Sequence, residues 1–383
     1  MNILESSIAY ERWLSQELKG NVDKKALKTR HATMAADAFQ FLRATYWRWA
    51  EIIYEVCPEL RDAPCVLGVG DIHVENFGSW RDLEGRLVWG VNDFDEAAHM
   101  PYVLDLVRLA TSAVLAPVRN IDARKVCLAI LSGYRAGIAE PAPFVLDREN
   151  RWLRMKVVVP EKERRQFWKK LDAKNGKRKR DSKVKKGNPP RRYLKVLRSS
   201  FPDSEIKLNF WPRVAGTGSL GRPRWIAYGT WKGAPIVREA KALVQSAWAR
   251  THNGSRRLQS ADIASGKYRS PDPWYAVRKG LVVRRRSPND RKIALSSKES
   301  DVPKAGFHSM ADIVNAQMLS AMGRDLGAVH LGTGNPRKAI RADLEARGQN
   351  WLLEAVKSAA QHTRVEQREW QRVHRKNSKS CDR

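Results

Sequence analysis

The 383-residue sequence has few cysteines, no long apolar run and far fewer acidic than basic residues. Its cysteines show neither C-x-x-C spacing nor a histidine cluster beside them, which argues against a disulfide framework and a structural zinc site; they are Cys57, Cys65, Cys127 and Cys381. No apolar run approaches the ~18 residues needed to cross a bilayer. The N-terminal segment also lacks the apolar core of a signal peptide. We therefore expect a cytoplasmic protein that does not enter a membrane.

The charge balance is strongly basic. Seventy-one Lys and Arg stand against 41 Asp and Glu, which gives a formal net charge of +30. Such an excess attracts nucleic acids, nucleotides and other anions, although it does not identify a fold. Hydrophobic residues make up 42% of the chain, enough for a sizeable core.

Periodicity predicts a mixture of helices and strands, an α+β fold class. Helical spacing of apolar residues predicts one amphipathic helix over 31–56 and a buried helix over 102–116. Two further helical regions are expected, over 309–330 and 337–374. Strands are expected within the following ranges: 65–78, 86–96, 214–231, 234–240 and 280–286.

A basic stretch interrupts this pattern between residues 161 and 198. It holds 17 Lys and Arg against four acids, which predicts an exposed insertion or linker, with 174–190 the most mobile part. The same stretch, together with the chain's 14 tryptophans, could contact nucleic acid through phosphate contacts and stacking. Nucleic-acid association is therefore an alternative function.

The densest polar chemistry lies between Asp71 and Asp95. Asp71 and Asn76 are five residues apart after an apolar strand, and Asp93 and Asp95 follow the next strand. Phosphoryl transfer needs a carboxylate to orient the attacking hydroxyl and hard oxygen ligands to hold Mg²⁺. We expect Asp71, Asn76 and Asp93 to converge on one cleft from adjacent strands of a hairpin. The alternative is that these acids cap turns or are solvated.

Several segments together resemble known families. The run GDIHVENFG (70–78) resembles the catalytic loop of aminoglycoside and choline kinase-like phosphotransferases, and DFDEAAHMPYVLDLVRLA (93–110) is similar to their metal-binding turn. With FLRAT (41–45), NDFDE (92–96) and VHLG (329–332), these motifs resemble the uncharacterised bacterial "domain of unknown function 2252" family. The resemblance implies a protein-kinase-like fold, ATP as a substrate and Mg²⁺ as a cofactor.

The resemblance also implies roles for single residues. Asp71 matches the catalytic base and Asn76 a magnesium ligand. Asp93 matches the principal metal ligand, and Asp95 is a second ligand or a hydrogen-bonded neighbour. His73 matches a loop histidine behind the base, or is an ordinary core histidine.

Two further residues have competing interpretations. Asp105 falls where these enzymes place an acid that braces the catalytic loop, although an acid near a helix N-terminus can simply offset the helix dipole. Arg43, on an otherwise apolar helix face, is a candidate anion contact or a surface arginine that packs its aliphatic stem.

A glycine-rich turn, GTGSLG (216–221), is a candidate phosphate loop. A lone G-x-G-x-x-G is a weak signal, but two predicted strands follow this one, and Gly216, Gly218 and Gly221 would approach the phosphates. Arg238, 17 residues after Gly221, occupies the place of the lysine that pairs with phosphates in kinases. Lys241 is an alternative donor only if the strand ends earlier. An ordinary hairpin turn is the competing interpretation.

The order of these parts differs from that of ordinary kinases, because the catalytic loop precedes the glycine loop. We therefore expect a circularly permuted kinase-like fold, in which the VHLG helix near the C-terminus would lead into the catalytic loop. The predicted division of the chain has four parts. These are a helix with the catalytic and metal loops (1–150), a basic insertion or linker (151–205), a β-rich nucleotide lobe (206–300) and C-terminal helices (301–383).

The sequence thus favours an ATP-dependent, Mg²⁺-requiring phosphotransferase. A strongly basic chain would not attract a polycationic aminoglycoside, so a neutral or anionic acceptor is expected. A nucleotide-binding pseudokinase is an alternative to an active enzyme, because Arg replaces the lysine and no helix glutamate is evident. A metallophosphoesterase is disfavoured, because the eight histidines lack the required arrangement.

Overall fold

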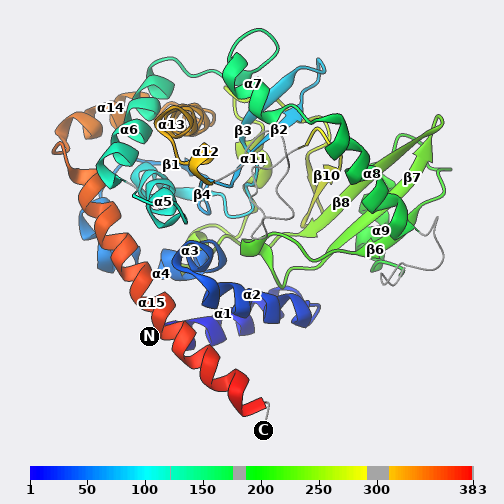
Figure 1. Cartoon of the computed structure of the whole chain (residues 1–383), viewed down its shortest axis with the longest axis horizontal. Helices are drawn as coiled ribbons and strands as arrows, with labels where there is room; N and C mark the ends of the chain where they lie inside the picture. Colours follow the sequence, from blue (N-terminus) through cyan, green and yellow to red (C-terminus); the bar gives the residue numbers. More distant parts are fainter. Residues whose placement is uncertain (121, 176–186, 291–309, 382–383) are drawn as a thin grey trace.

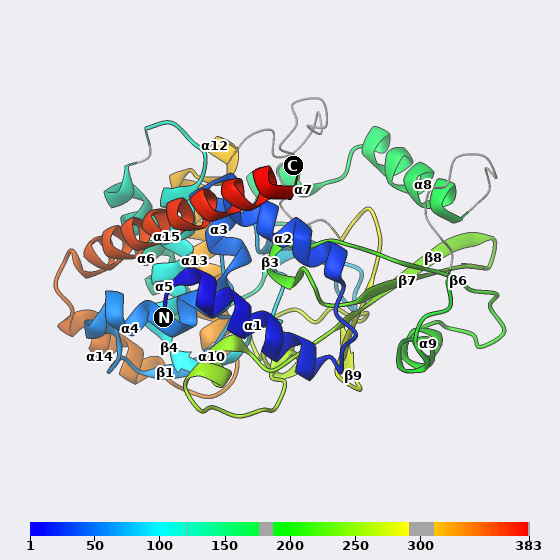
Figure 2. The ribbon, with the colours of Figure 1, turned by 90° about the horizontal axis from the view of Figure 1, so that it is seen from below.

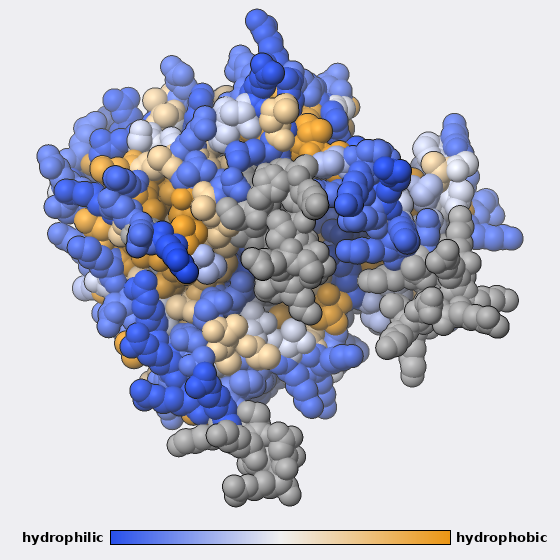
Figure 3. All heavy atoms as spheres, viewed as in Figure 1, coloured by the Kyte–Doolittle hydropathy of each residue, from blue (hydrophilic) through white to orange (hydrophobic). Residues whose placement is uncertain are grey.

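Most helices lie in one half of the molecule and a five-stranded sheet lies in the other (Figures 1 and 2). The structure is a computed structural model, which describes residues 1–120, 122–175, 187–290 and 310–381. It contains both helices and strands, which confirms the α+β class. In the described residues no helix is both long and apolar enough to span a membrane. The face seen in Figure 3 is mostly hydrophilic, and apolar side chains show over the helical half.

The single helix expected over 31–56 is three helices, preceded by α1 (Ile3–Glu17). They are α2 (Lys24–Ala36), α3 (Ala38–Ala44) and α4 (Tyr46–Val56). The first break falls at Asp37, whose backbone is extended and whose carboxylate accepts a hydrogen bond from the Gln40 N–H at 2.8 Å. The expectation was wrong because apolar spacing continued across a residue that caps a new helix.

The core of the helical half joins residues far apart in the sequence. The buried helix expected over 102–116 is confirmed as α5 (Tyr102–Leu115), and it packs beside α6 (Ala123–Ala139). The predicted C-terminal helices are also present, as α12 (Met310–Ile313), α13 (Ala316–His330), α14 (Arg337–Ala346) and α15 (Trp351–Cys381). α6 and α13 cross at backbone contact, since a Cβ on Gly133 would lie 1.9 Å from the Ser320 carbonyl oxygen.

Two small sheets carry the strands that precede the candidate acids. β1 (Cys65–Gly68) pairs with β4 (Ala98–Pro101), whereas β2 (Phe77–Arg81) pairs with β3 (Leu87–Val91), and β3 with β5 (Phe144–Val145). β1 and β3 therefore belong to different sheets. The strands that precede Asp71 and Asp93 were expected to be adjacent in one hairpin, and this was wrong. The loop after β1 leads into β2, and it is β2 that forms the hairpin with β3.

The large sheet is antiparallel, in the order β6-β7-β8-β10-β9. Its strands are β6 (Asn209–Pro212), β7 (Arg224–Trp231), β8 (Ala234–Ala242), β9 (Ala276–Arg278) and β10 (Leu281–Arg285). Side chains alternate between the two faces of a strand. Glu239 and Lys241 of β8 therefore share one face, and Arg238 lies on the other.

The basic stretch is not a simple exposed linker. After α7 (Arg151–Val157), residues 161–175 form helix α8 (Glu161–Asn175), and α9 (Arg191–Arg198) packs on β8 and β10. Tyr193, Val196 and Leu197 of α9 are buried, because they recur at helical spacing among the basic residues. Residues 176–186 lie outside the described residues, and contact of 161–198 with nucleic acid stays a prediction.

Candidate functional site

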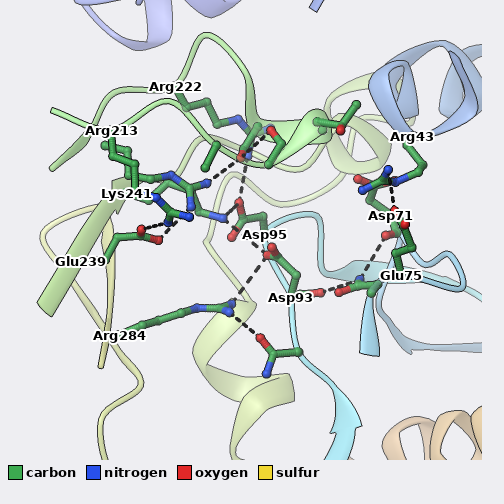
Figure 4. Close-up of a pocket in the computed structure, with 18 of the residues that line it drawn as sticks. Arg43, Asp71, Glu75, Asp93, Asp95, Arg213, Arg222, Glu239, Lys241 and Arg284 are labelled. Atoms are coloured by element: carbon green, nitrogen blue, oxygen red, sulfur yellow. Dashed lines mark hydrogen bonds and ion pairs between the residues drawn. The ribbon is translucent and has the colours of Figure 1, made fainter. Parts of the chain in front are cut away.

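One pocket of about 970 Å³ lies between the helical half and the large sheet. The loop after β1, the segment after β3, the glycine-rich turn and the inner face of β8 all line it. Figure 4 shows Asp93 and Asp95 between Asp71 on one side and Glu239 on the other. Segments around residues 71–96 and 216–241, distant in the sequence, therefore meet in one place.

Helices α5 and α13 hold the loop that carries Asp71. The Asp105 carboxylate of α5 accepts hydrogen bonds from the Val69 and Gly70 N–H groups, at 2.7 and 2.9 Å. His330, at the end of α13, places its Nε2 3.0 Å from Asp105 Oδ2. Both side chains are fully buried. The loop is thus fixed from behind by the first turn of one helix and the last turn of another.

Asp71 faces the pocket from a largely desolvated position. Its Oδ1 accepts a hydrogen bond at 2.6 Å from Arg108, a fully buried guanidinium that lies over the Tyr46 and Trp49 rings. Burial raises the pKa of Asp71 above its ordinary value, against the opposing effect of Arg108. A carboxyl with a raised pKa is better matched to accepting a proton near neutral pH.

Asn76 joins the two acidic segments. Its Nδ2 donates to the backbone oxygens of Asp71 and Asp93, at 3.1 and 3.0 Å. Its Oδ1 is buried and, within the described residues, accepts no hydrogen bond. Oδ1 of Asp95 is likewise buried without a partner there. Two unsatisfied oxygen acceptors in one pocket are unusual for side chains that serve only structure.

These oxygens suit a magnesium ion. No group of three His, Cys, Asp or Glu that could hold a metal occurs among the described residues. Mg²⁺ does not require one, because it keeps several waters and binds through one or two carboxylates together with substrate phosphates. Asn76 Oδ1 and the carboxylates of Asp93 and Asp95 would supply that small donor set, and the ion would neutralise charge on bound phosphates.

Cations from the sheet side face the same acids. Lys241 Nζ lies 3.5 Å from Asp93 Oδ1 and forms a shorter ion pair with Asp95. Arg284 approaches Asp93 at 3.7 Å, and Arg222 approaches Asp95 at the same distance. The lysine side chain is 4% exposed and Asp95 9%, so this pairing is buried. The acidic and basic sides of the pocket therefore neutralise each other directly.

The glycine-rich turn lies against Asp71. A Cβ on Gly218 would come within 2.5 Å of Asp71 Oδ2, so only glycine allows the turn to approach the carboxylate this closely. Gly216 and Gly221 have φ values of +80° and +97°, on either side of a short 3₁₀ turn, η2 (Thr217–Ser219). The structure thus brings the turn and the catalytic-loop candidate together.

Arg238 does not reach this pocket. It lies on the opposite face of β8, with its guanidinium 4.2 Å from the centre of the Trp274 ring and its Nε donating to the Ser200 carbonyl. Lys241 lines the pocket instead, although β8 continues to Ala242. The strict alternation of side chains along a strand could have identified Lys241, because it puts 239 and 241 on one face and 238 on the other.

His73 and Arg43 both line the pocket. Nδ1 of His73 accepts a hydrogen bond from the Glu75 N–H at 3.2 Å. Arg43 of α3 forms an ion pair with the buried Glu75 at 2.6 Å. Its guanidinium also lowers the pKa of Asp71, as a minor effect beside burial. Arg43 is therefore a pocket residue and not an exposed surface arginine.

A charged cluster that the sequence did not reveal occupies the sheet face next to Lys241. Glu239 pairs with Arg213, and at 2.8 Å with Arg224. Burial alone would raise the pKa of Glu239, but these two arginines and Arg286 hold it well below its ordinary value. The cluster joins residues after β6, on β7 and after β10, so only the folded sheet assembles it.

The pocket thus combines a desolvated acid, oxygen acceptors, a glycine turn and facing cations. Residues 22–194 match the model of a family described as "Uncharacterized protein conserved in bacteria (DUF2252)". This match supports a relationship to that family, and it covers the acidic side of the pocket. No curated protein and no solved structure matches the chain.

Proposed function

We propose that this protein is an ATP-dependent, Mg²⁺-requiring phosphotransferase with a permuted kinase-like fold. The observation that carries the proposal is the single pocket in which the Asp71–Asn76 loop, Asp93, the glycine turn and Lys241 face one another. A kinase requires this combination: a base, metal ligands, a glycine loop over the phosphates and a lysine to pair with them.

The arrangement of the large sheet supports the same proposal. The glycine turn connects β6 to β7, the first two strands of this sheet along the chain, and Lys241 lies on the third strand, β8. Kinases place their glycine loop and phosphate-pairing lysine in the same way. Lys241 therefore replaces Arg238 in the proposed role, which removes one argument for an inactive pseudokinase.

Each side chain then has a chemical task. An acceptor hydroxyl attacks the γ-phosphorus of ATP, its proton passes to Asp71, and the bond to the β–γ bridging oxygen breaks to release ADP. Lys241 and the N–H groups of the glycine turn would hold the phosphates. Asn76 and Asp93 would hold Mg²⁺, which offsets phosphate charge when bound. The acceptor we propose is neutral or anionic.

Thermal unfolding with nucleotides tests this proposal. A ligand present at 100 times its Kd stabilises the folded state by about 2.7 kcal/mol, so MgATP should raise Tm clearly. Asp93→Asn should lose the Mg²⁺-dependent part of that rise. Asp71→Asn should keep it but lose ATP turnover, because the amide still accepts from Arg108 but cannot take a proton.

The outcomes separate the alternatives. Binding of MgATP without turnover by the unmodified protein, over a broad panel of hydroxyl acceptors, would favour a pseudokinase. The absence of any nucleotide-dependent shift would refute the proposal. Arg278→Gln serves as the control variant, since Arg278 is exposed on β9 and does not line the pocket.

A further inference from the structure

The arginine cluster next to Lys241 has more positive charge than its neighbours neutralise. Arg213 and Arg224 share the carboxylate of Glu239, and Arg286 lies close enough to lower the pKa of that acid. All four residues line the pocket. Among the described residues, Arg286 forms no ion pair within 4 Å, and the charges of Glu239 and Asp290 act on it only at longer range. Arg213 and Arg224 therefore use the one carboxylate of the cluster, and Arg286 adds a third positive charge beside it.

Neighbouring acids do not remove this excess. Asp290 lines the same region, but Arg285 holds it through contacts of 3.3 and 3.4 Å. Glu163 of α8 also lines the pocket and has interactions of its own. Burial, and then the charge of Arg213, lower the pKa of Arg286 to about 10. A partly buried cation in this condition is stabilised when an anion joins it.

The cluster is also connected to the glycine turn. Arg224 donates through Nη1 to Glu239 and through Nη2 to Ser219 Oγ of the turn, at 2.8 and 2.9 Å. Glu239 lies two residues before Lys241 on the same face of β8, a separation of about 7 Å along a strand. A second anionic group could therefore bind beside the phosphates held at Lys241 without sharing its contacts.

We propose that Arg213, Arg224 and Arg286 form an oxyanion subsite for a phosphate group carried by the acceptor. That the phosphate group belongs to an acceptor rests on the proposed function, whereas the expectation that these arginines bind phosphate does not. Arginine is suited to this task, because its planar fork donates two parallel hydrogen bonds to phosphate. Glu239 keeps two of the guanidinium groups oriented in the absence of ligand, and the guanidinium of Arg286 completes the subsite.

Calorimetric titration of the full chain with inorganic phosphate tests the subsite. Arg286→Gln should weaken phosphate binding about tenfold or more, the loss of a charge-assisted contact. Arg286→Lys should bind with intermediate affinity, since it keeps the charge but loses the fork. Arg278→Gln, the control, should retain phosphate binding, and Lys241→Gln distinguishes binding at the arginine cluster from binding at the lysine that faces Asp93 and Asp95. Thermal unfolding of each variant verifies that it is folded, and Arg213→Gln replaces Arg286→Gln if that variant is not.

Other results overturn the proposal in distinguishable ways. No phosphate binding to the unmodified chain at millimolar concentration, or equal binding by Arg286→Gln, would refute the subsite. Loss of phosphate binding in Lys241→Gln alone would place the anion at Lys241. If Arg286→Gln weakens MgATP as much as phosphate, the cluster holds the nucleotide and not the acceptor. Failure of MgATP to bind, with phosphate binding intact, would refute only the kinase proposal.

Discussion

The two sides of the pocket are held in place by different forces. On the helical side, backbone N–H groups bind buried carboxylates, so the loops before Asp71 and Asp93 have their positions set by main-chain contacts. On the sheet side, Lys241, Arg222 and Glu239 are held by ion pairs between side chains. Main-chain contacts fix a loop whether or not a ligand is bound, whereas ion pairs can exchange one anion for another. The helical side is thus preorganised and the sheet side is adjustable.

Two buried acids perform the same task on the helical side. Asp105 of α5 accepts the N–H groups that follow β1, and Asp325 of α13 accepts the Val91 N–H at the end of β3, at 2.7 Å. Each acid reaches a strand end that leads into a pocket loop. Satisfied networks of this kind fix a geometry, and removing one member leaves several donors unpaired.

The largest expected effect is that of Asp105→Ala. It leaves the Val69 and Gly70 N–H groups and the His330 ring without their buried acceptor, so the free energy of unfolding should fall by about 3–5 kcal/mol. Urea unfolding measures this. The comparison variant is Asp93→Ala, whose side chain is 26% exposed and forms ion pairs with Lys241 and Arg284 of the adjustable side. Similar losses in both variants would contradict the contrast between the two sides.

The second prediction concerns Asp325 and pH. Burial raises its pKa from 3.8 to about 6, so the folded state holds a proton that the unfolded state has lost between those values. Stability therefore falls as pH rises through this range, by about 3 kcal/mol at most.

Asp325→Asn should remove the contribution of Asp325 to this slope, because an amide oxygen still accepts from Val91 but does not ionise. Burial also raises the pKa of Asp290 to about 6, so the slope should become smaller but not vanish. Urea unfolding of both proteins below, within and above the range gives the difference in slope. Asp325→Asn should be the more stable protein above pH 6. A variant whose stability keeps the same pH dependence would show that another group is responsible.

The third prediction tests the adjustable side by comparing two neighbours on β8. Lys241→Met removes the cation that faces Asp93 and Asp95, and should weaken MgATP binding about 10- to 100-fold. Arg238→Met places an apolar chain against Phe201 and Trp274 on the opposite face, and should leave MgATP binding unchanged. Equilibrium titration with MgATP measures both. Equal losses would mean that the two faces of β8 are not functionally distinct.

Much of the fold could be predicted from the sequence where one local rule applied. The buried helix α5 and the strands β7, β8 and β10 carry periodic apolar residues, and each was found. The break between α2 and α3 was missed, because the capping side chain of Asp37 outweighed a continuous apolar spacing, and the break between α3 and α4 at Thr45 was missed as well. α9 was missed for the opposite reason: its buried residues stand among so many basic ones that composition suggested a linker.

The site could be predicted only on its acidic side. Asp71, Asn76, Asp93 and Asp95 lie within 25 residues and follow apolar strands, so sequence distance reflects their distance in space. Arg213, Arg224 and Arg286 meet only because four strands, β6, β7, β8 and β10, pair in a certain register. Spacing along the chain carries no such information. The partnership of Asp105 with His330, 225 residues apart, is hidden from sequence in the same way.

The smallest expected effect occurs where the two sides touch, at Gly218. An added Cβ would lie 2.5 Å from Asp71 Oδ2 and 3.2 Å from the Arg43 carbonyl oxygen. Because Arg108 holds the Asp71 carboxylate, the glycine turn must move away, at a cost of about 1–3 kcal/mol for Gly218→Ala. Part of that cost should disappear in Gly218→Ala combined with Asp71→Gly, where the carboxylate is absent.

Gly348→Ala is the matched control, since nothing lies within 4 Å of a Cβ there and its φ is ordinary. It should leave Tm unchanged or slightly raised, because alanine reduces the freedom of the unfolded chain. Thermal unfolding of the four proteins completes the comparison. If Gly218→Ala is as neutral as Gly348→Ala, the glycine turn does not rest on Asp71 in solution. The glycine turn would then contact Asp71 only after a ligand has bound in the pocket.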